Sequence, residues 1–321
     1  MGFERDREMK LERKRILFFG AGAIGSLYAG KLALWGHDVT MLARGKRLEE
    51  LREQGLVLFS EKQGEEKATI SLISELKSDD KYDYVFVTLR RDNLHDVLPI
   101  LGQNQSQSFV CMVNTADGFS EWITYLGAER IIAAFPGANA KIENGSVHYQ
   151  LTPTLIQPTT VGELNGTESQ RLLVLTNMLQ EAGFPNAISK NMDSWLKSHL
   201  AMICPLAYGI DSGDSFSKNK KAITLMCRAL KENFSFLYSS KYGVKPAMLH
   251  IYRILPNFLL VRIMRSVFNS TWIETMRKFQ TPSAQNEMNL LANDFIRLAE
   301  ENGVELQFLK EIMNHTKPNH L

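Results

Sequence analysis

Three glycines near the start of the chain have the spacing of a phosphate-binding turn. Gly20, Gly22 and Gly25 follow a short apolar run and precede apolar residues spaced three and four apart, which predicts a strand, a turn and a helix over residues 16–36. The first glycine permits a tight turn, the second lets the backbone approach a pyrophosphate, and the third lets the helix pack closely on the strand. The free N–H groups and the positive end of the helix dipole then face the phosphates. We therefore predict a dinucleotide-binding turn made of Gly20, Ala21, Gly22, Ala23, Ile24 and Gly25, with a purely structural strand-to-helix turn as the alternative.

The next predicted strand, residues 37–43, ends at Arg44. Enzymes that use NAD carry an acidic residue at this strand end, where it bonds the ribose hydroxyls. Here Arg44 is followed by further cations, and a guanidinium suits a ribose 2′-phosphate. The sequence thus predicts NADP (NADPH) as cofactor, with Arg44 on the 2′-phosphate. The alternative is that these are solvated loop cations, which is what we expect of Arg47 because it begins a predicted helix over residues 47–54.

Two further buried strands are predicted at residues 82–89 and 108–113, separated by a helix over residues 90–101. The second strand delivers Asn114 at its carboxyl end, with Gly118 beyond it. Ligands bind at the carboxyl ends of strands in open α/β sheets. Asn114 is therefore a candidate for the nicotinamide side of the site.

The remaining pattern divides the chain in two. Up to residue 189 we expect further strands, and from residue 190 onward only helices, with no flexible linker between. This predicts an α/β protein with a Rossmann-type dinucleotide-binding domain over residues 16–189 and an all-α C-terminal domain over residues 190–321. The smaller expected elements are a hairpin insertion (55–59 and 67–73), antiparallel strands at one end of the sheet (130–135, 147–152 and 154–160), a helix (168–182), a last strand (187–189), a long helical pair (218–265) and a final helix (282–302).

The composition is that of an ordinary globular protein and narrows the class of partner. The formal net charge of +2 gives no reason to expect nucleic acid or a membrane as partner. The three cysteines are far apart and lack metal-ligand spacing, so we expect reduced core residues in a cytoplasmic protein and no metal site. Residues 1–15 form a charged leader without the apolar core of a secretory signal. Residues 254–264 are too short to span a bilayer but apolar enough for a helix interface in a homodimer.

Over nearly its whole length the sequence resembles the ketopantoate reductase family, the NADPH-dependent 2-dehydropantoate 2-reductases of pantothenate biosynthesis. The resemblance is carried by the segments ILFFGAGAIGSLYAGKLALWGHDVTMLARG, VTLRRDNL, WLKSHL and NEMNLLANDFIRLAEENGV, together with the strand that ends in Asn114. It implies hydride transfer from NADPH to C2 of a 2-oxo acid, a small molecule that would be the partner of the protein.

The resemblance implies that Lys197 is the general acid that protonates the carbonyl oxygen as the hydride arrives. The alternative is an ordinary exposed helix pair with Asp193, four residues earlier. His199 is a second candidate acid, although two positions along a helix point to opposite sides, so it does not share the role of Lys197.

Three more residues are implied by the family match. Glu287 matches the substrate-binding glutamate, although an exposed helix charge would fit the pattern almost as well, and Thr275 takes the place of a substrate-binding serine. Arg90 stands where the family often has a lysine that approaches the cofactor or substrate, with Arg91 as the alternative.

Two positions depart from the family, and they put the substrate in question. Asparagines are usual one and two turns after the lysine, and here these places hold Ala201 and Pro205. Each lost hydrogen bond to substrate is worth about 0.5–1.5 kcal/mol. The chain is thus a divergent member, for which reduction of ketopantoate or a closely related 2-oxo acid is the favoured hypothesis. The alternatives are an NADP reductase of a bulkier oxo acid or an imine, and a non-catalytic NADP-binding sensor.

Overall fold

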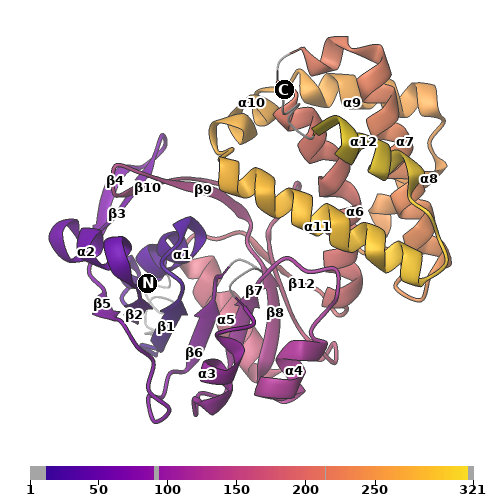
Figure 1. Cartoon of the computed structure of the whole chain (residues 1–321). Helices are drawn as coiled ribbons and strands as arrows, with labels where there is room; N and C mark the ends of the chain where they lie inside the picture. Colours follow the sequence, from indigo (N-terminus) through magenta and orange to yellow (C-terminus); the bar gives the residue numbers. More distant parts are fainter. Residues whose placement is uncertain (1–11, 90–93, 214, 317–321) are drawn as a thin grey trace, which may run out of the picture.

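The computed structural model describes residues 12–89, 94–213 and 215–316. Strands and helices alternate up to Ile188, and from Met192 onward the described elements are all helical. Figure 1 shows these two parts side by side, with α6 and α11 the helices nearest the strands. The fold is therefore an α/β, Rossmann-type part followed by an all-α C-terminal part, and the predicted fold class is confirmed.

The first part is built on an eight-stranded sheet in the order β12-β11-β8-β7-β6-β1-β2-β5. All neighbouring strands in it are parallel except β11 and β8. The central strands are apolar and buried because helices cover both faces of the sheet. The bounds are β1 (Arg15–Phe19), β2 (Asp38–Leu42), β5 (Ser71–Ile73), β6 (Tyr84–Val87), β7 (Phe109–Met112), β8 (Ile131–Phe135), β11 (Thr159–Glu163) and β12 (Asn186–Ile188).

Two helical layers flank this sheet. Helices α1 and α5 share one core with one face of the sheet, and helices α3 and α4 with the first turns of α6 share a second core on the other. The bounds are α1 (Ala23–Leu34), α2 (Gly45–Gln54), α3 (Leu98–Gln103), α4 (Ser120–Leu126) and α5 (Gln170–Glu181). The predicted helix over residues 90–101 thus begins later than expected among the described residues, and residues 90–93 lie outside them.

A second, four-stranded sheet covers α1. Its order is β4-β3-β10-β9, with bounds β3 (Leu56–Ser60), β4 (Gly64–Ala68), β9 (Ala138–Glu143) and β10 (Ser146–Leu151). The predicted hairpin insertion is confirmed in β3 and β4, which pair antiparallel. Leu58 and Val147 face the core that contains α1, because the alternation of the strands gives this small sheet one apolar face.

The middle of the chain follows the expected pattern only in part. The strand at residues 131–135 pairs antiparallel with β11, as expected, and on its other side it pairs parallel with β7, to which α4 connects it. The strand at residues 146–151 lies in the four-stranded sheet rather than at the end of the main one. The strand predicted at 154–160 is displaced to Thr159–Glu163, since residues 153–157 form a turn.

The helical part contains seven α-helices among the described residues. Thr281 caps α11, with its hydroxyl accepting a hydrogen bond from Ala284 N at 3.2 Å, as the capping pattern predicts. The short α10 and the terminal α12 were not predicted as separate helices. The bounds are α6 (Met192–Asp211), α7 (Lys220–Ser239), α8 (Ile251–Ile254), α9 (Asn257–Phe268), α10 (Thr271–Lys278), α11 (Pro282–Glu301) and α12 (Gln307–Thr316).

Helix α6 contains a proline in its interior, at Pro205. Proline has no N–H, so the carbonyl of Ala201, four residues earlier, loses its helical donor. Asn233 on α7 supplies a replacement: its Nδ2 donates to the Ala201 oxygen at 3.0 Å from a fully buried position. The departure from the family at Pro205 is thus matched by a specific contact between two helices.

The termini and the cysteine thiols can be compared with the sequence expectations. Residues 1–11 of the predicted leader lie outside the described residues, and β1 begins at Arg15, so the proposed leader boundary is not tested. Cys111, Cys204 and Cys227 are free and buried, as expected. Within the described ranges, no single helix is long and apolar enough to cross a bilayer.

Candidate active site

The predicted glycine turn joins β1 to α1 and has the geometry of a phosphate cradle. Gly20 has a φ of +123°, in the region that favours glycine. A Cβ at Gly25 would lie 2.2 Å from the Gly20 oxygen, so only glycine allows this close approach of helix and strand. A Cβ at Gly22 would meet no heavy atom of the described residues within 4 Å, which leaves space beside the backbone. These are the three roles that the sequence predicts for the glycines.

The first turn of α1 leaves donors for an anion. Gly22 is the N-cap residue, and no side chain caps this end of the helix. N–H groups in the first turn of a helix have no partner within it, and the helix dipole adds positive potential there. Thr88 follows β6 at the same edge of the sheet, and its hydroxyl donates to the Gly20 oxygen at 3.0 Å. The turn therefore has an open form that fits a pyrophosphate. The residues present are thus compatible with a bound dinucleotide.

Arg44 and Arg47, the two arginines at the start of α2, lie in different surroundings. Arg44 is exposed at the N-terminus of α2, and its Nε donates only to the Ser74 oxygen at 3.3 Å. Arg47 is largely buried and donates to the oxygens of Ala21 and Gly145 at 3.3 and 3.1 Å. The expectation that Arg47 is a solvated cation is wrong, because it ties α2 to the glycine turn. Arg44 keeps its guanidinium available at the position predicted for a 2′-phosphate.

Asn114 lies just after β7, in the loop that leads to α4. Its Oδ1 is buried and has no hydrogen-bond partner among the described residues. A buried amide oxygen without a donor is uncommon, and it suits a ligand that brings an N–H group. The carboxamide of a nicotinamide is such a group, so the position fits the role predicted for Asn114.

Lys197 lies in the second turn of α6, close to this loop. A Cβ at Gly118 would be 3.9 Å from Lys197 Nζ and 3.0 Å from Asp193 Oδ1. Lys197 is only 3% exposed, its ammonium is hydrogen-bonded to Asp193, and Nζ lies 4.7 Å from the centre of the Tyr242 ring. The pair with Asp193 therefore exists, but it is not the exposed surface pair of the alternative hypothesis.

His199 faces another environment, between aromatic rings. Its ring stacks on Trp195 at 5.5 Å between centroids and approaches Phe135 to 4.2 Å. Burial lowers the pKa of His199 to about 4, so the imidazole is neutral at physiological pH. A neutral imidazole with this pKa is a poor general acid at neutral pH, which leaves Lys197 as the better candidate.

Glu287 lies on α11, which packs along α6. The residue is partly buried, and Leu291 and Phe295 of the same helix lie in the core that α6 completes with Leu200. Further along α11, Arg297 binds both carboxylate oxygens of Asp117 at 3.1 Å. Because Asp117 lies in the loop after β7, α11 and this loop are joined on the same side of the molecule as Lys197.

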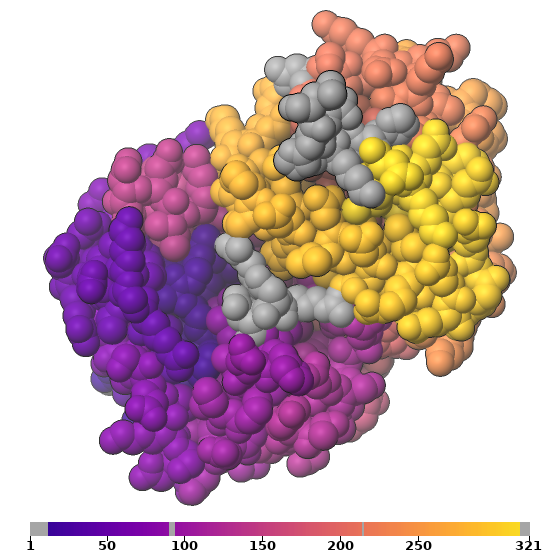
Figure 2. Space-filling model, in the orientation of Figure 1, coloured from indigo at the N-terminus to yellow at the C-terminus, as the bar shows by residue number. Residues whose placement is uncertain are grey.

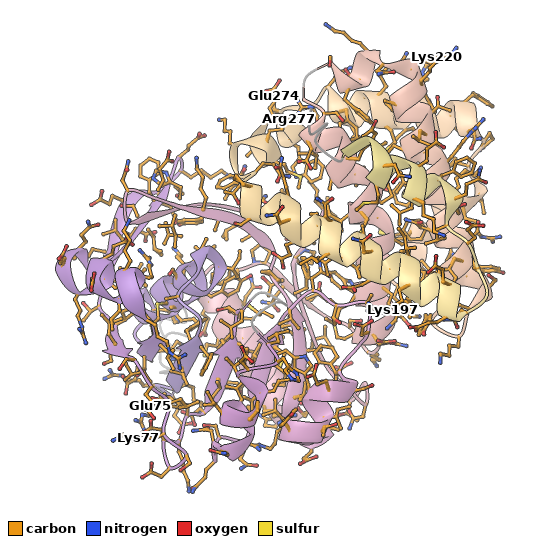
Figure 3. All side chains as sticks on the ribbon, in the orientation of Figure 1. Glu75, Lys77, Lys197, Lys220, Glu274 and Arg277 are labelled. Atoms are coloured by element: carbon orange, nitrogen blue, oxygen red, sulfur yellow. The ribbon has the colours of Figure 1, made fainter. Side chains whose placement is uncertain are left out.

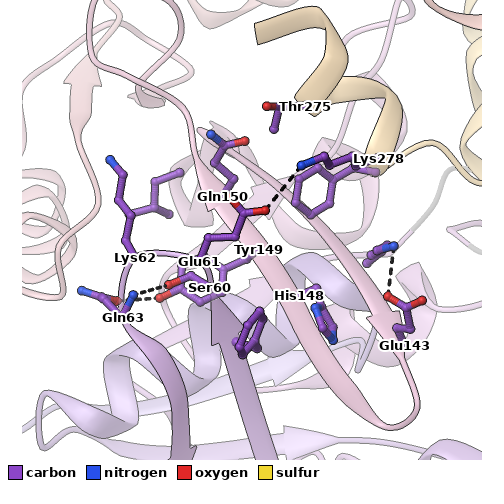
Figure 4. Close-up of a pocket in the computed structure, with 14 residues that line it drawn as sticks. Ser60, Glu61, Lys62, Gln63, Glu143, His148, Tyr149, Gln150, Thr275 and Lys278 are labelled. Atoms are coloured by element: carbon purple, nitrogen blue, oxygen red, sulfur yellow. Dashed lines mark hydrogen bonds and ion pairs between the residues drawn. The ribbon is translucent and has the colours of Figure 1, made fainter. Parts of the chain in front are cut away.

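Thr275 has a different position from the other predicted site residues. It lies on α10, where its hydroxyl donates to the Thr271 oxygen at 2.9 Å, and it lines a pocket of about 490 Å³ between α10 and the four-stranded sheet. Figure 4 shows this pocket, with Thr275 above it and an ion pair of 3.4 Å between Lys278 and Glu61 across it. Glu274 and Arg277 lie on the same short helix as Thr275. Figure 3 shows both of them well apart from Lys197.

The predicted site residues thus lie in two groups. The glycine turn lies at the edge of the sheet, and the loop at Asn114 and Gly118 meets Lys197. Thr275 is outside both, and Arg90 lies outside the described residues. Figure 2 shows a recess between the indigo and purple N-terminal part and the yellow and orange helical part, with indigo atoms at its floor.

Sequence reasoning missed three residues of this region: Thr88, Arg47 and Tyr242. The threonine directly after a buried strand is a signal that could have been used, because strand ends are where ligand-side residues lie. Nothing local marks Tyr242, which reaches Lys197 from the segment after α7. No cluster of three potential metal ligands occurs among the residues described.

Comparison with known proteins agrees with this architecture. Residues 16–166 match the family model described as ketopantoate reductase PanE/ApbA. A 2-dehydropantoate 2-reductase from Mesorhizobium japonicum is 29% identical over 211 residues, which cover 57% of this chain and 63% of that protein. The chain thus aligns with less than two thirds of the length of this relative.

Two solved structures have the same fold over nearly the whole chain. The 2-dehydropantoate 2-reductase from Methylococcus capsulatus superposes with a TM-score of 0.69 at 17% identity, covering 94% of this chain and 96% of the other. A D-mandelate dehydrogenase, in a ternary structure with NADH and anilino(oxo)acetate, gives a TM-score of 0.70 at 19% identity with the same coverage. Residues 16–166 are thus a domain of the ketopantoate reductase PanE/ApbA family, and nearly the whole chain has the fold of these solved structures.

Proposed function

We propose that this protein is an oxidoreductase that uses NADPH to reduce a 2-oxo acid to the 2-hydroxy acid, with 2-dehydropantoate as the first candidate substrate. The observation that carries the proposal is the buried ammonium of Lys197 beside the loop that follows β7. That loop and the glycine turn both follow parallel strands of one sheet, at the edge where dinucleotides bind in this type of fold. The match of residues 16–166 to the ketopantoate reductase family supports the same reaction class.

In the proposed reaction each residue of the site has a separate role. Bound NADPH would supply the hydride that adds to C2 of the 2-oxo acid. The Lys197 ammonium donates a proton to the carbonyl oxygen as negative charge develops on it. Asp193 holds the ammonium in place, and because the carboxylate is 46% exposed it connects the lysine to solvent, from which the proton is restored. The Tyr242 ring covers the ammonium and shields it from other anions.

Arg44 is the residue proposed to select NADPH over NADH. Its exposed guanidinium makes a single hydrogen bond among the described residues, so it is available for a 2′-phosphate. Substitution Arg44→Gln should weaken NADPH binding by about tenfold or more, the value of one lost charge-assisted hydrogen bond, and leave NADH binding nearly unchanged. Fluorescence titration of both nucleotides measures this. Equal affinity of the wild type for NADH and NADPH would contradict the assignment.

A second candidate is a bulkier, aromatic 2-oxo acid. The pocket that Thr275 lines is walled by Phe59, His148 and Phe279, a larger and more aromatic space than a small aliphatic acid needs. The fold neighbour that carries anilino(oxo)acetate, an aromatic oxo acid, favours the same class. This candidate requires the two parts of the molecule to bring the pocket and Lys197 to one substrate. A non-catalytic NADP-binding sensor is the remaining hypothesis.

The experiment is NADPH oxidation with a panel of 2-oxo acids. Ketopantoate, pyruvate and benzoylformate are compared by kcat/KM. A wide preference for ketopantoate supports the first candidate, and a wide preference for benzoylformate supports the second. Tight NADPH binding without reduction of any of these acids would refute both 2-oxo acid candidates and support the sensor.

The role of Lys197 is tested on the best substrate of that panel. Lys197→Met should lower kcat by about 10²–10⁴-fold, the usual contribution of a general acid, while NADPH affinity changes less than threefold. Lys218→Met is the matched control, an exposed lysine elsewhere in the helical part. Circular dichroism and thermal unfolding establish that both variants fold. Unchanged turnover in the folded Lys197→Met variant would exclude the assignment.

A further inference from the structure

The surface formed by α8 and the start of α9 is unusually apolar for an exposed part of the molecule. Met248, Ile251, Ile254 and Phe258 are 72%, 47%, 65% and 78% exposed. Met248, Ile251 and Ile254 are spaced three residues apart before the helix break, and Phe258 is exposed just after it. We call this apolar strip the α8–α9 face. Figure 1 shows α8 and α9 at the outer side of the helical part, away from the eight-stranded sheet. Contiguous apolar surface of this kind marks an interaction site.

The folding of α9 requires that this strip faces outward. Leu260, Met264 and Phe268 on the opposite side of α9 are at most 4% exposed and fill the core of the helical part. Phe258 and Arg262 lie on the outer side of α9 and are not part of this core. The exposure is thus a consequence of packing that is already complete without these side chains.

The segment of the chain that carries the strip has charges of one sign. Residues 233–273 contain five lysines and arginines, at positions 241, 245, 253, 262 and 265, and no aspartate or glutamate. Arg253 stacks on the exposed ring of Tyr238 at 3.8 Å, which places an aromatic residue and a cation together at the edge of the strip. The carboxylate preceding this segment, Glu232, is already hydrogen-bonded to the N–H groups of Gln307 and Phe308, both at 2.9 Å.

We propose that the α8–α9 face binds the surface of an anionic phospholipid bilayer. An apolar strip bordered by lysine and arginine is complementary to such a surface, where acyl chains take up the apolar side chains and phosphates attract the cations. A second copy of this chain fits less well, because its residues 233–273 offer further cations and no carboxylate to pair with them. The two helical segments, Ala247–Ile254 and Asn257–Phe268, are bent by 119° at the break between them. The inference is independent of the proposed reaction.

Vesicle co-sedimentation tests the proposal with the full chain. Vesicles of phosphatidylcholine alone are compared with vesicles of phosphatidylcholine and phosphatidylglycerol in equal amounts. We expect at least tenfold tighter binding to the anionic vesicles at about 0.1 M salt, and loss of most of this preference near 1 M salt, where charge interactions are screened.

Two double variants separate the apolar and the charged contributions. Ile254→Ser with Phe258→Ser should weaken binding to anionic vesicles by at least tenfold, because two side chains that would be buried in lipid become polar. Arg262→Gln with Arg265→Gln should weaken it by about tenfold or more, since each cation near the surface contributes to attraction. All four side chains are exposed, so the fold should be unaffected.

Matched controls carry the same substitutions elsewhere. Leu155→Ser with Ile156→Ser removes two side chains that are 94% and 50% exposed, outside the helical part. Lys77→Gln with Lys81→Gln removes two exposed cations, and Figure 3 shows Lys77 at the far end of the molecule. Both controls should bind as the wild type does, within twofold.

Three results would overturn the proposal. The first is absence of vesicle binding, or equal binding to neutral and anionic vesicles. The second is wild-type binding by the Ile254→Ser, Phe258→Ser variant. The third is a stable dimer in analytical ultracentrifugation that this variant converts to a monomer, which would make the α8–α9 face an interface between copies of the chain.

Discussion

Two alanine substitutions in the glycine turn should separate folding from cofactor binding. In Gly25→Ala the new Cβ would lie 2.2 Å from the Gly20 oxygen and 2.4 Å from Thr88 Oγ1. The first of these is a backbone atom that cannot rotate away, so α1 must move off β1. We expect an overpacking cost of about 1–3 kcal/mol. Loss of the hydrogen bond from Thr88 to Gly20 adds about 0.5–1.5 kcal/mol.

In Gly22→Ala the same methyl group meets no atom within 4 Å in the part of the chain that the structure describes. The backbone there is extended, with φ −70° and ψ −179°, which alanine adopts without strain. Alanine is a poorer N-cap than glycine, but it also lowers the entropy of the unfolded chain, so the free energy of unfolding should fall by less than about 1 kcal/mol. The methyl does occupy the space predicted for the pyrophosphate, so NADPH affinity should fall by tenfold or more, about 1.4 kcal/mol.

Urea unfolding and NADPH fluorescence titration measure the two quantities on both proteins, and each variant is the control for the other. Gly22→Ala should unfold at nearly the wild-type midpoint yet bind NADPH weakly. Gly25→Ala should unfold at a clearly lower midpoint. Wild-type NADPH affinity in Gly22→Ala would refute the placement of the dinucleotide over this turn. A stability loss equal to that of Gly25→Ala would refute the description of the open space.

Two further predictions concern stability. The folded-state pKa of His199, lowered to about 4 by burial, lies below the ordinary value of 6.5, so the unfolded chain binds an extra proton as pH falls through this window and stability falls with it. At pH 5 the penalty is roughly 2 kcal/mol, and His199→Phe should flatten the loss of stability between pH 7 and pH 5 by that amount in urea unfolding; parallel curves would contradict it. Asn233→Leu should cost about 1–3 kcal/mol because it leaves a buried carbonyl of α6 without a donor. Pro205→Ala restores a backbone N–H to that carbonyl, so the same substitution should cost clearly less in the Pro205→Ala background, and additive costs in the double-mutant cycle would contradict this.

Local features of the chain were enough to predict the glycine turn and the position of Arg44 in the candidate site. The glycine spacing, the buried run before it and the end of the next strand at Arg44 each act within a few residues, so they can be recognised without knowledge of the fold. The same holds for the cap at Thr281 and for the change from strands to helices after residue 189. The family resemblance added Lys197 to this set, and the geometry of α6 places it beside the loop after β7.

The rest depends on contacts between residues far apart in sequence, which no local pattern encodes. Whether residues 131–135 pair parallel is decided by the crossover through α4, and Arg47 is buried only because the β9–β10 turn at Gly145 lies over α2. Tertiary packing likewise places Asn233 where it donates to the Ala201 carbonyl, which lacks its helical donor because of Pro205. The sequence by itself therefore determined which candidate site residues the chain carries, through residue types and short spacings. Only the tertiary structure decided which side chains are buried beside one another, because burial depends on elements that the chain brings together across long distances in sequence.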